Sequence, residues 1–527
     1  MLIAELIQIL GREATDRPIE FLSKGLAVTL LVYVIVNEVF RSKARLSTFN
    51  GPRGFPLIGN LYQVRHDAAE KYREWSKEFG AVYQVQLGNI PVLVVNSAAA
   101  AKVILGHNSQ AVASRPELYT FHKVTFTSFR VLTIVANTAG TTIGTSPYNE
   151  SLKRRRKGAA SALNRPSIKT YLPHLDLETK DFLKDAFIYG KAGKVPVDPM
   201  PLVQRLSLSL AVTLNWGFRF PSHENPLFKE IIDVEVNISR FRSVTDNLQD
   251  YIPLMRMNPF SAGTRQAVEM RRRRDIYLSK LNNDLKEKVQ NGTYEPCIQA
   301  NVMLDEEAKL DDVELTSISL TMLSAGFETF STVTTWAIGF LAQHPEIQQK
   351  AFEAIQEFYD VTNPLCDVND DQNCPYIRAL VRESLRYFTV LRLSLPRATN
   401  KDFMFEGKLI PKGTIIFLNS WACNMDRELW EDPEVFRPER WLESPEAPMF
   451  TYGMGYRMCA GTLLANRELY LTFLRMLTSF KISTNEAIDS NPLTGVADKR
   501  NLVLAPKSYH VTFTPRNEEA LRASLKL

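Results

Sequence analysis

The first strong feature of the hydrophobic pattern is an apolar run near the N-terminus, Gly25 to Phe40, which three basic residues follow closely. A spanning helix needs about 20 residues, so this short run is compatible with a membrane anchor, an interfacial helix, a buried helix or a signal peptide. The basic flank and the absence of a clear cleavage site favour an uncleaved anchor. We therefore expect an N-terminal segment, 1–45, and one large cytosolic domain, 46–527.

The pattern of the large domain changes between helical and strand periods. Residues 68–79 have helical spacing, and period two on both sides of Gly88-Asn89 predicts a β-hairpin. Residues 152–343 are mostly helical in spacing, and strand signals return near residues 404–417. The predicted fold class is α+β, mostly α, with a small β-rich region.

The longest helical segment begins at Asp311 and Asp312, which suit a helix N-terminus, and continues to about Gln343. With a rise of 1.5 Å per residue, this helix is about 45 Å long. A helix of this length crosses a whole domain.

The middle of this predicted helix carries a glycine, an acid and a hydroxyl. Gly326 weakens the helix, and the hydroxyl of Thr329 can bond the carbonyl of Ala325 four residues earlier. Glu328 adds a carboxylate suited to proton delivery. The alternative is an ordinary glycine kink in a buried helix.

A glycine-rich loop, residues 450–461, stands directly before another amphipathic segment. Cys459 lies at the start of that helix, where unpaired amides favour a thiolate. Gly455 and Gly461 let the backbone approach something flat, and Arg457 can reach an anion. A flat, anionic, iron-bearing ligand is haem; the alternative is a structural cysteine in a glycine-rich turn.

Composition narrows the classes of function. The chain has 527 residues, 45% of them hydrophobic, which is enough for a large core. A net charge of +5 is by itself too weak to argue for nucleic-acid binding. Five cysteines without a CxxC pair argue against a disulfide framework and a structural zinc site, and favour a reducing compartment.

At the cysteine loop the chain resembles the cytochrome P450 family, and the resemblance covers nearly the whole sequence. It implies the cytochrome P450 fold, with haem b bound to Cys459 as the axial ligand and metal ligand. Residues 325–329 match the oxygen-activating motif, in which Thr329 and Glu328 support O₂ activation. Tyr452 stands where the family usually has Phe.

The resemblance also implies a structural triad and a set of propionate partners. Glu383, Arg386 and Arg440 match the triad that holds the cysteine loop, although an i, i+3 pair alone is usually only a surface ion pair. The propionate partners would be Arg156, Arg397 and Arg457. The backbone at Gly455 and Gly461 would lie against the cofactor.

The run Lys153-Arg-Arg-Arg-Lys157 resembles the C helix of the family, whose basic residues other than Arg156 would face an acidic reductase. A solvated helix face is the alternative. Together these features imply a monooxygenase of the endoplasmic reticulum membrane, with a cytosolic haem-thiolate domain that receives electrons from NADPH-cytochrome P450 reductase. A haem-thiolate isomerase and a non-catalytic haem sensor are alternatives; Glu328, Thr329 and the basic run favour the monooxygenase.

More narrowly, residues 141–147 and 152–166 resemble the fungal phenylacetate hydroxylases, and residues 387–392 and 451–456 are similar to the branch that acts on 3-hydroxyphenylacetate. This resemblance implies hydroxylation of an aromatic acid at ring position 6, which gives homogentisate. Phenylacetate 2-hydroxylation and hydroxylation of a secondary metabolite are the alternatives.

An aromatic acid substrate needs a partner for its carboxylate, because an unpaired buried charge is costly. The candidate anchors are His122, Lys123 and Arg392, and the candidate apolar walls are Phe327, Leu391, Leu393 and Leu395. The stretch 124–136 looks inserted relative to the family; it is either a lid over the substrate or translated intron sequence.

Overall fold

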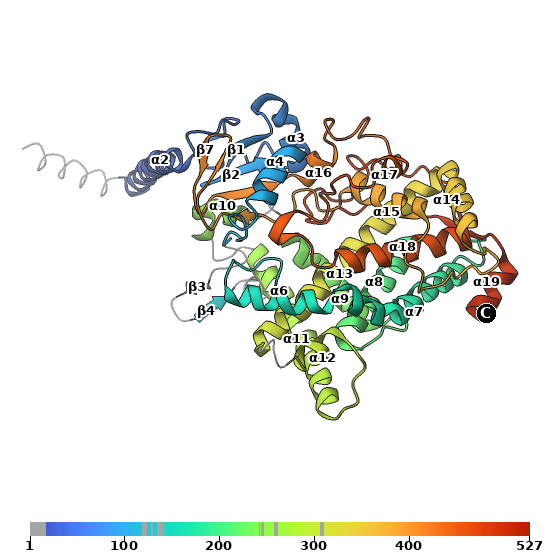
Figure 1. The fold of residues 1–527 in the computed structure, drawn as a ribbon. Coiled ribbons are helices and arrows are strands. Elements are labelled where there is room, and N and C mark those ends of the chain that lie inside the picture. The colour runs from blue at the N-terminus through green and yellow to red at the C-terminus, as the bar shows by residue number, and fades with distance from the viewer. Residues whose placement is uncertain are drawn as a thin grey trace, which may run out of the picture.

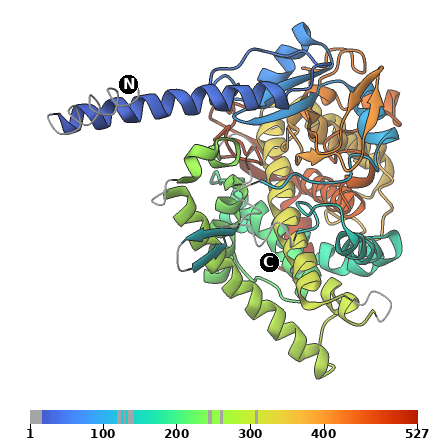
Figure 2. The same ribbon diagram turned by 90° about the vertical axis from the view of Figure 1, so that its left-hand side faces the viewer.

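A computed structural model shows a mostly helical body with small sheets, from which one N-terminal helix projects (Figures 1 and 2). The fold class predicted from the sequence is confirmed. The residues that the structure describes are 17–118, 124–127, 130–133, 142–241, 243, 247–257, 262–305 and 310–527.

The helices make up most of the described chain. The longer ones are α2 (Pro18–Ala44), α3 (Ala68–Phe79), α6 (Glu150–Ala162), α7 (Arg165–Tyr189), α8 (Pro199–Trp216), α9 (Pro226–Phe241), α11 (Ala262–Gln290), α13 (Asp312–Gln343), α14 (Pro345–Phe358), α15 (Pro375–Phe388), α18 (Thr462–Ser479) and α19 (Glu518–Leu525). The shorter ones are α4 (Ala98–Ala101), η1 (Lys102–His107), α10 (Leu248–Tyr251), η3 (Pro253–Met257), α12 (Ile298–Met303), α16 (Ser420–Asn424), α17 (Arg440–Glu443) and η4 (Gly455–Arg457).

The main sheet has the order β1-β2-β8-β5 and lies near the base of α2 (Figure 1). Its strands are β1 (Val82–Leu87), β2 (Ile90–Val95), β8 (Ile415–Leu418) and β5 (Arg397–Ala398). The predicted hairpin is confirmed, because β1 pairs antiparallel with β2 across Gly88-Asn89. Strand β8 pairs parallel with β2, which joins segments more than 300 residues apart in the sequence.

Three further antiparallel pairs complete the strands of the described chain: β3 (Val124–Thr127) with β4 (Arg130–Thr133), β6 (Phe403–Phe405) with β7 (Lys408–Ile410), and β9 (Phe480–Ser483) with β10 (Thr512–Pro515). The first pair falls in the stretch 124–136, whose other residues lie outside the described ones. The candidate anchors His122 and Lys123 also lie outside them.

Helix α2 is longer than the apolar run that predicted it. It has a mean hydropathy of 1.9 over its most apolar window, none of which is buried, and it is the one described helix long and apolar enough to span a membrane. Only its C-terminal end is fixed to the body, where Asn89 donates to Asn37 and Arg41 donates to the carbonyl of Phe55. These properties fit a membrane anchor or a signal sequence.

Helix α13 passes through the centre of the body, where Figure 2 shows it as the long yellow helix. The predicted N-terminus is confirmed: Asp311 accepts from the amide of Glu314, and the Glu314 side chain accepts from the amide of Asp311. The capping box satisfies two amides that would otherwise lack partners. The largest hydrophobic cluster joins α13 to α7, α8, α15 and α18, so the helix behind the cysteine loop shares the core of the molecule.

Candidate active site

The cysteine loop is held against η1 by a very close backbone approach. Gly455 has φ of 66°, and a Cβ added there would lie 1.9 Å from the carbonyl oxygen of Leu105. Only glycine fits both requirements. The loop closes on itself where the amide of Cys459 donates to the carbonyl of Tyr452 over 3.0 Å.

Cys459 differs from the other four cysteines. Cys459 is exposed, whereas the other four cysteines are buried: Cys297, Cys366, Cys374 and Cys423. Burial raises the pKa of the Cys459 thiol, while the amide of Gly461, the hydroxyl of Thr462 and the charge of Arg156 lower it. The sulfur therefore lies deep in the protein, with an open side and three groups that stabilise a thiolate.

The middle of α13 also has an open side. Ala325 and Gly326 are exposed, although every residue from Phe330 to Ala342 is buried. The predicted backbone bond is present, because Thr329 Oγ1 donates to the carbonyl oxygen of Ala325 over 3.0 Å. Glu328 is half-buried beside it.

One hydrophobic cluster connects this part of α13 to the cysteine loop. Met322 of α13, Ala460 of the loop and Leu464 of α18 all pack against it. The two open surfaces thus belong to elements that pack against the same hydrophobic cluster.

Arg397 is buried and only partly hydrogen-bonded. Its Nη2 donates to the carbonyl of Met454 over 2.7 Å, but its Nε and Nη1 have no partner in the described part of the chain. Burial, and then the charge of Arg156, lower the pKa of Arg397 to about 10. Unsatisfied buried nitrogens of this kind are costly unless a ligand accepts from them.

Arg156 projects from α6 toward the cysteine loop. Its guanidinium lies 5.2 Å from the ring centroid of Tyr456, and its Nη2 is 3.5 Å from the carbonyl oxygen of Met458. Burial lowers its pKa, while Tyr456 and Cys459 raise it. The structure therefore places this predicted propionate partner beside the cysteine.

Arg457 has a different arrangement from the one expected. All three of its nitrogens donate to backbone carbonyls, those of Ala113, Ile143 and Ser146. Burial and the charges of Arg156 and Arg397 lower its pKa to about 9. This geometry favours a tether between the loop and the backbone of Ala113, Ile143 and Ser146 over direct contact with a propionate.

Arg115 is a member of the site that the sequence did not indicate. It donates to the carbonyls of Gly144 and Pro396 over 2.8 and 2.7 Å. Burial lowers its pKa far below the usual value, and the charges of Arg457, Arg397 and Arg156 lower it further. It lies in an irregular segment with no periodic pattern to single it out.

These four arginines form a positive cluster without an acid. None of them makes an ion pair with a carboxylate within the described ranges. After burial, the charge of Arg156 is a further cause that lowers the pKa values of Arg115, Arg397 and Arg457. Such a cluster is suited to a ligand that brings two carboxylates, because arginine binds carboxylate bidentately. The residues present therefore fit haem, with its two propionates.

The structure brings the predicted triad together. Arg386 Nε and Nη2 donate to the two oxygens of Glu383, both over 2.8 Å, and Arg440 Nε donates to Oε1 over 3.2 Å. Glu383 and Arg386 are 0% exposed. The surface-pair alternative is therefore wrong.

Asn424 connects this triad to the cysteine loop. Its carbonyl accepts from Arg386 Nη1 over 3.0 Å, while its side chain accepts from the amide of Phe450 and donates to Thr451 Oγ1. This asparagine was not identified from the sequence. It shows how the triad fixes the first residues of the loop.

The basic run 153–157 divides between the surface and the interior. Lys153 and Lys157 are exposed, and the exposed Arg154 also pairs with Glu314 of α13. Arg155 is buried, with Nη1 2.5 Å from Ser317 Oγ. The expectation that the whole run apart from Arg156 faces a partner is wrong for Arg155, because that side of α6 packs on α13.

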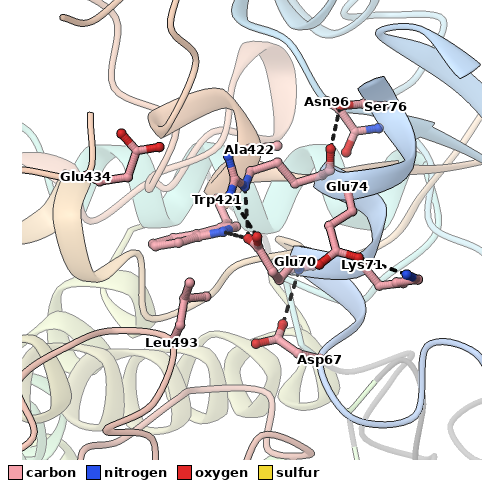
Figure 3. A network of polar contacts seen from close by, with 12 residues as sticks. Asp67, Glu70, Lys71, Glu74, Ser76, Asn96, Trp421, Ala422, Glu434 and Leu493 are labelled. Atoms are coloured by element: carbon pink, nitrogen blue, oxygen red, sulfur yellow. Dashed lines mark hydrogen bonds and ion pairs between the residues drawn. The ribbon is translucent and has the colours of Figure 1, made fainter. Parts of the chain in front are cut away.

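Two of the substrate candidates are also corrected. Arg392 is buried and pairs with Asp67 over 2.8 Å, and its guanidinium lies 4.7 Å from the Trp421 ring centroid. Figure 3 shows Asp67 and Trp421 with Glu70 at the start of α3. Because Asp67 compensates its charge, Arg392 is not a free carboxylate anchor.

Phe327 is fully buried in a hydrophobic cluster with residues of α8, α9 and α11. Leu393 is likewise in a core cluster beside β1 and β2. Leu395 is half-buried, with Cδ1 3.4 Å from where a Cβ on Gly144 would lie. Of these predicted walls, Leu395 is the one that lies beside the arginine cluster.

Comparison with known proteins gives a consistent result. The model of the cytochrome P450 family matches residues 49–513. A 3-hydroxyphenylacetate 6-hydroxylase of Emericella nidulans is 61% identical over 526 residues, which cover 100% of both chains. A phenylacetate 2-hydroxylase of the same organism is 37% identical over 94% of this chain and 96% of its own, and a cytochrome P450 monooxygenase of Mycosarcoma maydis is 37% identical over 94% and 93%.

Proposed function

The chain belongs to the cytochrome P450 family, and we propose that this monooxygenase hydroxylates 3-hydroxyphenylacetate at carbon 6 of the ring. The observation that carries the proposal is the 61% identity over the full length of a relative with that activity. The reaction consumes the acid, O₂, NADPH and a proton and gives 2,5-dihydroxyphenylacetate (homogentisate), water and NADP⁺. Phenylacetate is the second candidate substrate, on the basis of 37% identity to a phenylacetate 2-hydroxylase.

The family implies haem, which supplies the iron chemistry that activates dioxygen. We assign its axial thiolate to Cys459 and its propionates to Arg397 and Arg156, with Arg115 and Arg457 contributing positive charge and holding the loops around them. Gly455 and Gly461 let the loop lie against the cofactor. The support is the exposed surface of Cys459 and the unsatisfied nitrogens of Arg397.

Proton delivery is assigned to Thr329 and Glu328. The Thr329 hydroxyl is held by the carbonyl of Ala325 at the open side of α13, where its proton can be passed to a reacting group. Glu328 directly precedes Thr329 in the chain and is half-buried, and its carboxylate would supply the proton that Thr329 passes on.

The surface of the chain supports a proposal for electron supply and location. The exposed Lys153, Arg154 and Lys157 would steer an acidic NADPH-cytochrome P450 reductase to the side of the cysteine loop. Helix α2 would anchor segment 1–45 in the endoplasmic reticulum membrane and leave the catalytic domain, 46–527, in the cytosol.

The direct test is turnover by the purified holoenzyme with reductase, NADPH and 3-hydroxyphenylacetate. We expect one homogentisate per NADPH in the coupled limit, measured by chromatography against authentic standards. Phenylacetate in a parallel reaction should give less 2-hydroxyphenylacetate. No ring-hydroxylated product from either acid would contradict the assigned substrate class.

Thr329→Ala should keep haem and substrate binding but lower the product formed per NADPH by about tenfold or more, because general acid–base groups contribute 10²–10⁴-fold. NADPH, hydrogen peroxide and product should be measured together, with peroxide accounting for the lost coupling.

The matched control for Thr329 is Thr335→Ala. Thr335 makes the same bond to a carbonyl four residues earlier, that of Ser331, but it is buried away from the open side of α13. Unchanged coupling in Thr329→Ala, or equal uncoupling in both variants, would count against a role of Thr329 in proton delivery.

A further inference from the structure

The open side of α13 extends over about two helical turns. Between residues 317 and 342, the residues of this helix that are not buried form three pairs: Thr321 and Met322, Ala325 and Gly326, and Glu328 and Thr329. Members of successive pairs are three or four residues apart, so they lie on one side of the helix. Because these residues keep accessible surface, packing alone does not hold this side of α13 in place.

The Thr321 hydroxyl joins the open side to another part of the chain. Its oxygen accepts from the amide of Ile143 over 2.9 Å, and it donates to the carbonyl of Ser317, four residues earlier, over 2.7 Å. Ile143 is 4% exposed, so water does not replace this acceptor. Helix α13 is thus tied to Ile143 about one turn before Ala325.

The backbone of Ile143 is also bonded to the cysteine loop. Its carbonyl accepts from Arg457 Nη1 over 3.0 Å, and the carbonyl of Ser146 accepts from Arg457 Nη2. The Ile143 side chain belongs to the hydrophobic cluster against which Met322 and Ala460 pack. One residue therefore connects α13 with the cysteine loop through a hydrogen bond on each side.

Helix α6 adds a second connection between the same two elements. Arg155 Nη1 of α6 lies 2.5 Å from Ser317 Oγ of α13. The Arg156 guanidinium of α6 lies 5.2 Å from the ring centroid of Tyr456 in the cysteine loop. These contacts hold the earlier part of α13, whereas the contact of Thr321 lies within the open side.

Helix α13 is weakened just beyond Thr321. The carbonyl of Ala325 accepts from Thr329 Oγ1 over 3.0 Å, and Gly326 has no side chain. A threonine that bonds a carbonyl one turn back often bends a helix, and glycine lowers helix stability. A fixed point next to this weak section therefore decides how far the open side stands from the cysteine loop.

We propose that Thr321 is a positioning residue, which through the backbone of Ile143 holds the open side of α13 at the distance from the cysteine loop that hydroxylation requires. The inference rests on the proposed roles of Cys459 and Thr329, and it names the contact that sets their separation. A misplacement of about 1 Å can lower a rate about 10²-fold. The bond from Ile143 to Thr321 thus controls coupling although Thr321 takes no part in the chemistry.

The competing explanation is that the Thr321 hydroxyl only stabilises its own helix through the bond to Ser317. Thr316 of α13 separates the two explanations. Its hydroxyl donates in the same way to the carbonyl of Asp312 over 2.8 Å, but it makes no hydrogen bond to another element in the described part of the chain.

The experiment compares Thr321→Val, Thr321→Ser and Thr316→Val as purified holoenzymes. Valine keeps the shape of threonine but removes the acceptor of the Ile143 amide, so hydrogen–deuterium exchange of residues 142–146 should become about tenfold faster or more, as measured by mass spectrometry. Serine keeps the hydroxyl and should restore slow exchange. Thr316→Val should leave the exchange of these residues unaltered.

The same variants are then compared in the reaction with 3-hydroxyphenylacetate and reductase. Thr321→Val should form at least about threefold less product per NADPH, with hydrogen peroxide accounting for the difference. The C–O stretching band of its reduced, CO-bound form should shift in the infrared spectrum, because this band responds to the groups around the bound gas. Thr321→Ser and Thr316→Val should have wild-type coupling and a wild-type band.

Faster exchange in Thr321→Val with unaltered coupling and an unaltered CO band would show that the bond supports only the fold. Unaltered exchange would show that Thr321 does not hold Ile143, and equal defects in the Val and Ser variants would exclude the hydroxyl as the cause; each of these results overturns the proposal. Thr321→Ala replaces Thr321→Val if the latter does not bind haem. If the wild type hydroxylates neither aromatic acid, the proposed substrate is wrong, while the exchange rates and the CO band still decide the role of Thr321.

Discussion

Cys459→His is expected to abolish hydroxylation and to remove the red-shifted Soret band of the reduced, CO-bound protein. Imidazole is neutral and does not donate electron density as a thiolate does, so the spectrum and the O₂ chemistry of a thiolate-bound haem are lost together. The measurement is the reduced CO difference spectrum of the purified variant, with its haem content determined separately. A normal thiolate spectrum from this variant would refute the assignment of Cys459.

Cys374→Ala is the matched control for this change. Cys374 also stands at the N-terminus of a long helix, as the N-cap residue of α15, but it is buried in the core. We expect its loss to leave the spectrum unaltered. Comparing the two variants tests whether a helix N-terminus alone is enough for thiolate ligation. Cys459 also lies in the glycine-rich loop, is exposed and has the arginine cluster beside it, whereas Cys374 has none of these.

The elements that the sequence predicted correctly have local signals. The β1–β2 hairpin follows from period two around Gly88-Asn89, and the start of α13 follows from Asp311 and Asp312 before the periodic segment. A turn or a cap is made by residues that are close in the chain, so its chemistry is visible in the sequence.

The incorrect predictions for Phe327 and Arg155 concern residues in helices. There the position of a residue around the helix axis decides whether its side chain is buried. Phe327 directly follows the exposed Gly326. Successive residues of a helix differ by a rotation of about 100° around its axis, so the Phe327 side chain points into the core. Arg155 in α6 stands within a basic run and is buried for the same reason. A charge run resembles a solvated face in the sequence, and only packing shows which member points inward.

Residues that act through long-range contacts had no signal at all. Arg115 reaches Gly144 and Pro396, and Asn424 joins Arg386 to the first residues of the cysteine loop. Both lie in short or irregular segments, where neither period nor spacing predicts a contact. The arginine cluster could thus be predicted only in part.

The triad stabilises the fold through a network with no solvent access. Besides Arg386 and Arg440, Glu383 accepts from Trp441 Nε1 over 2.9 Å and from the amide of Arg437 over 2.8 Å. Arg386 also donates to the carbonyl of Asn424, and the Asn424 side chain accepts from the amide of Phe450. Loss of the carboxylate charge would therefore leave two buried guanidinium groups uncompensated and loosen the start of the cysteine loop.

Glu383→Gln is expected to destabilise the protein by about 3–5 kcal/mol, the usual cost of breaking a buried ion pair on one side, and to lower the fraction that retains a thiolate-type haem spectrum. Unfolding should be followed by circular dichroism, and the spectrum by CO binding after reduction. Glu443→Gln is the control: it removes the exposed partner of Arg437 from the same region and should cost less than about 1 kcal/mol. Equal stability of the two variants would show that the triad contributes no more to stability than a surface ion pair. A stable Glu383→Gln protein with a normal spectrum would show that the cysteine loop is held by its own glycines and by Arg457.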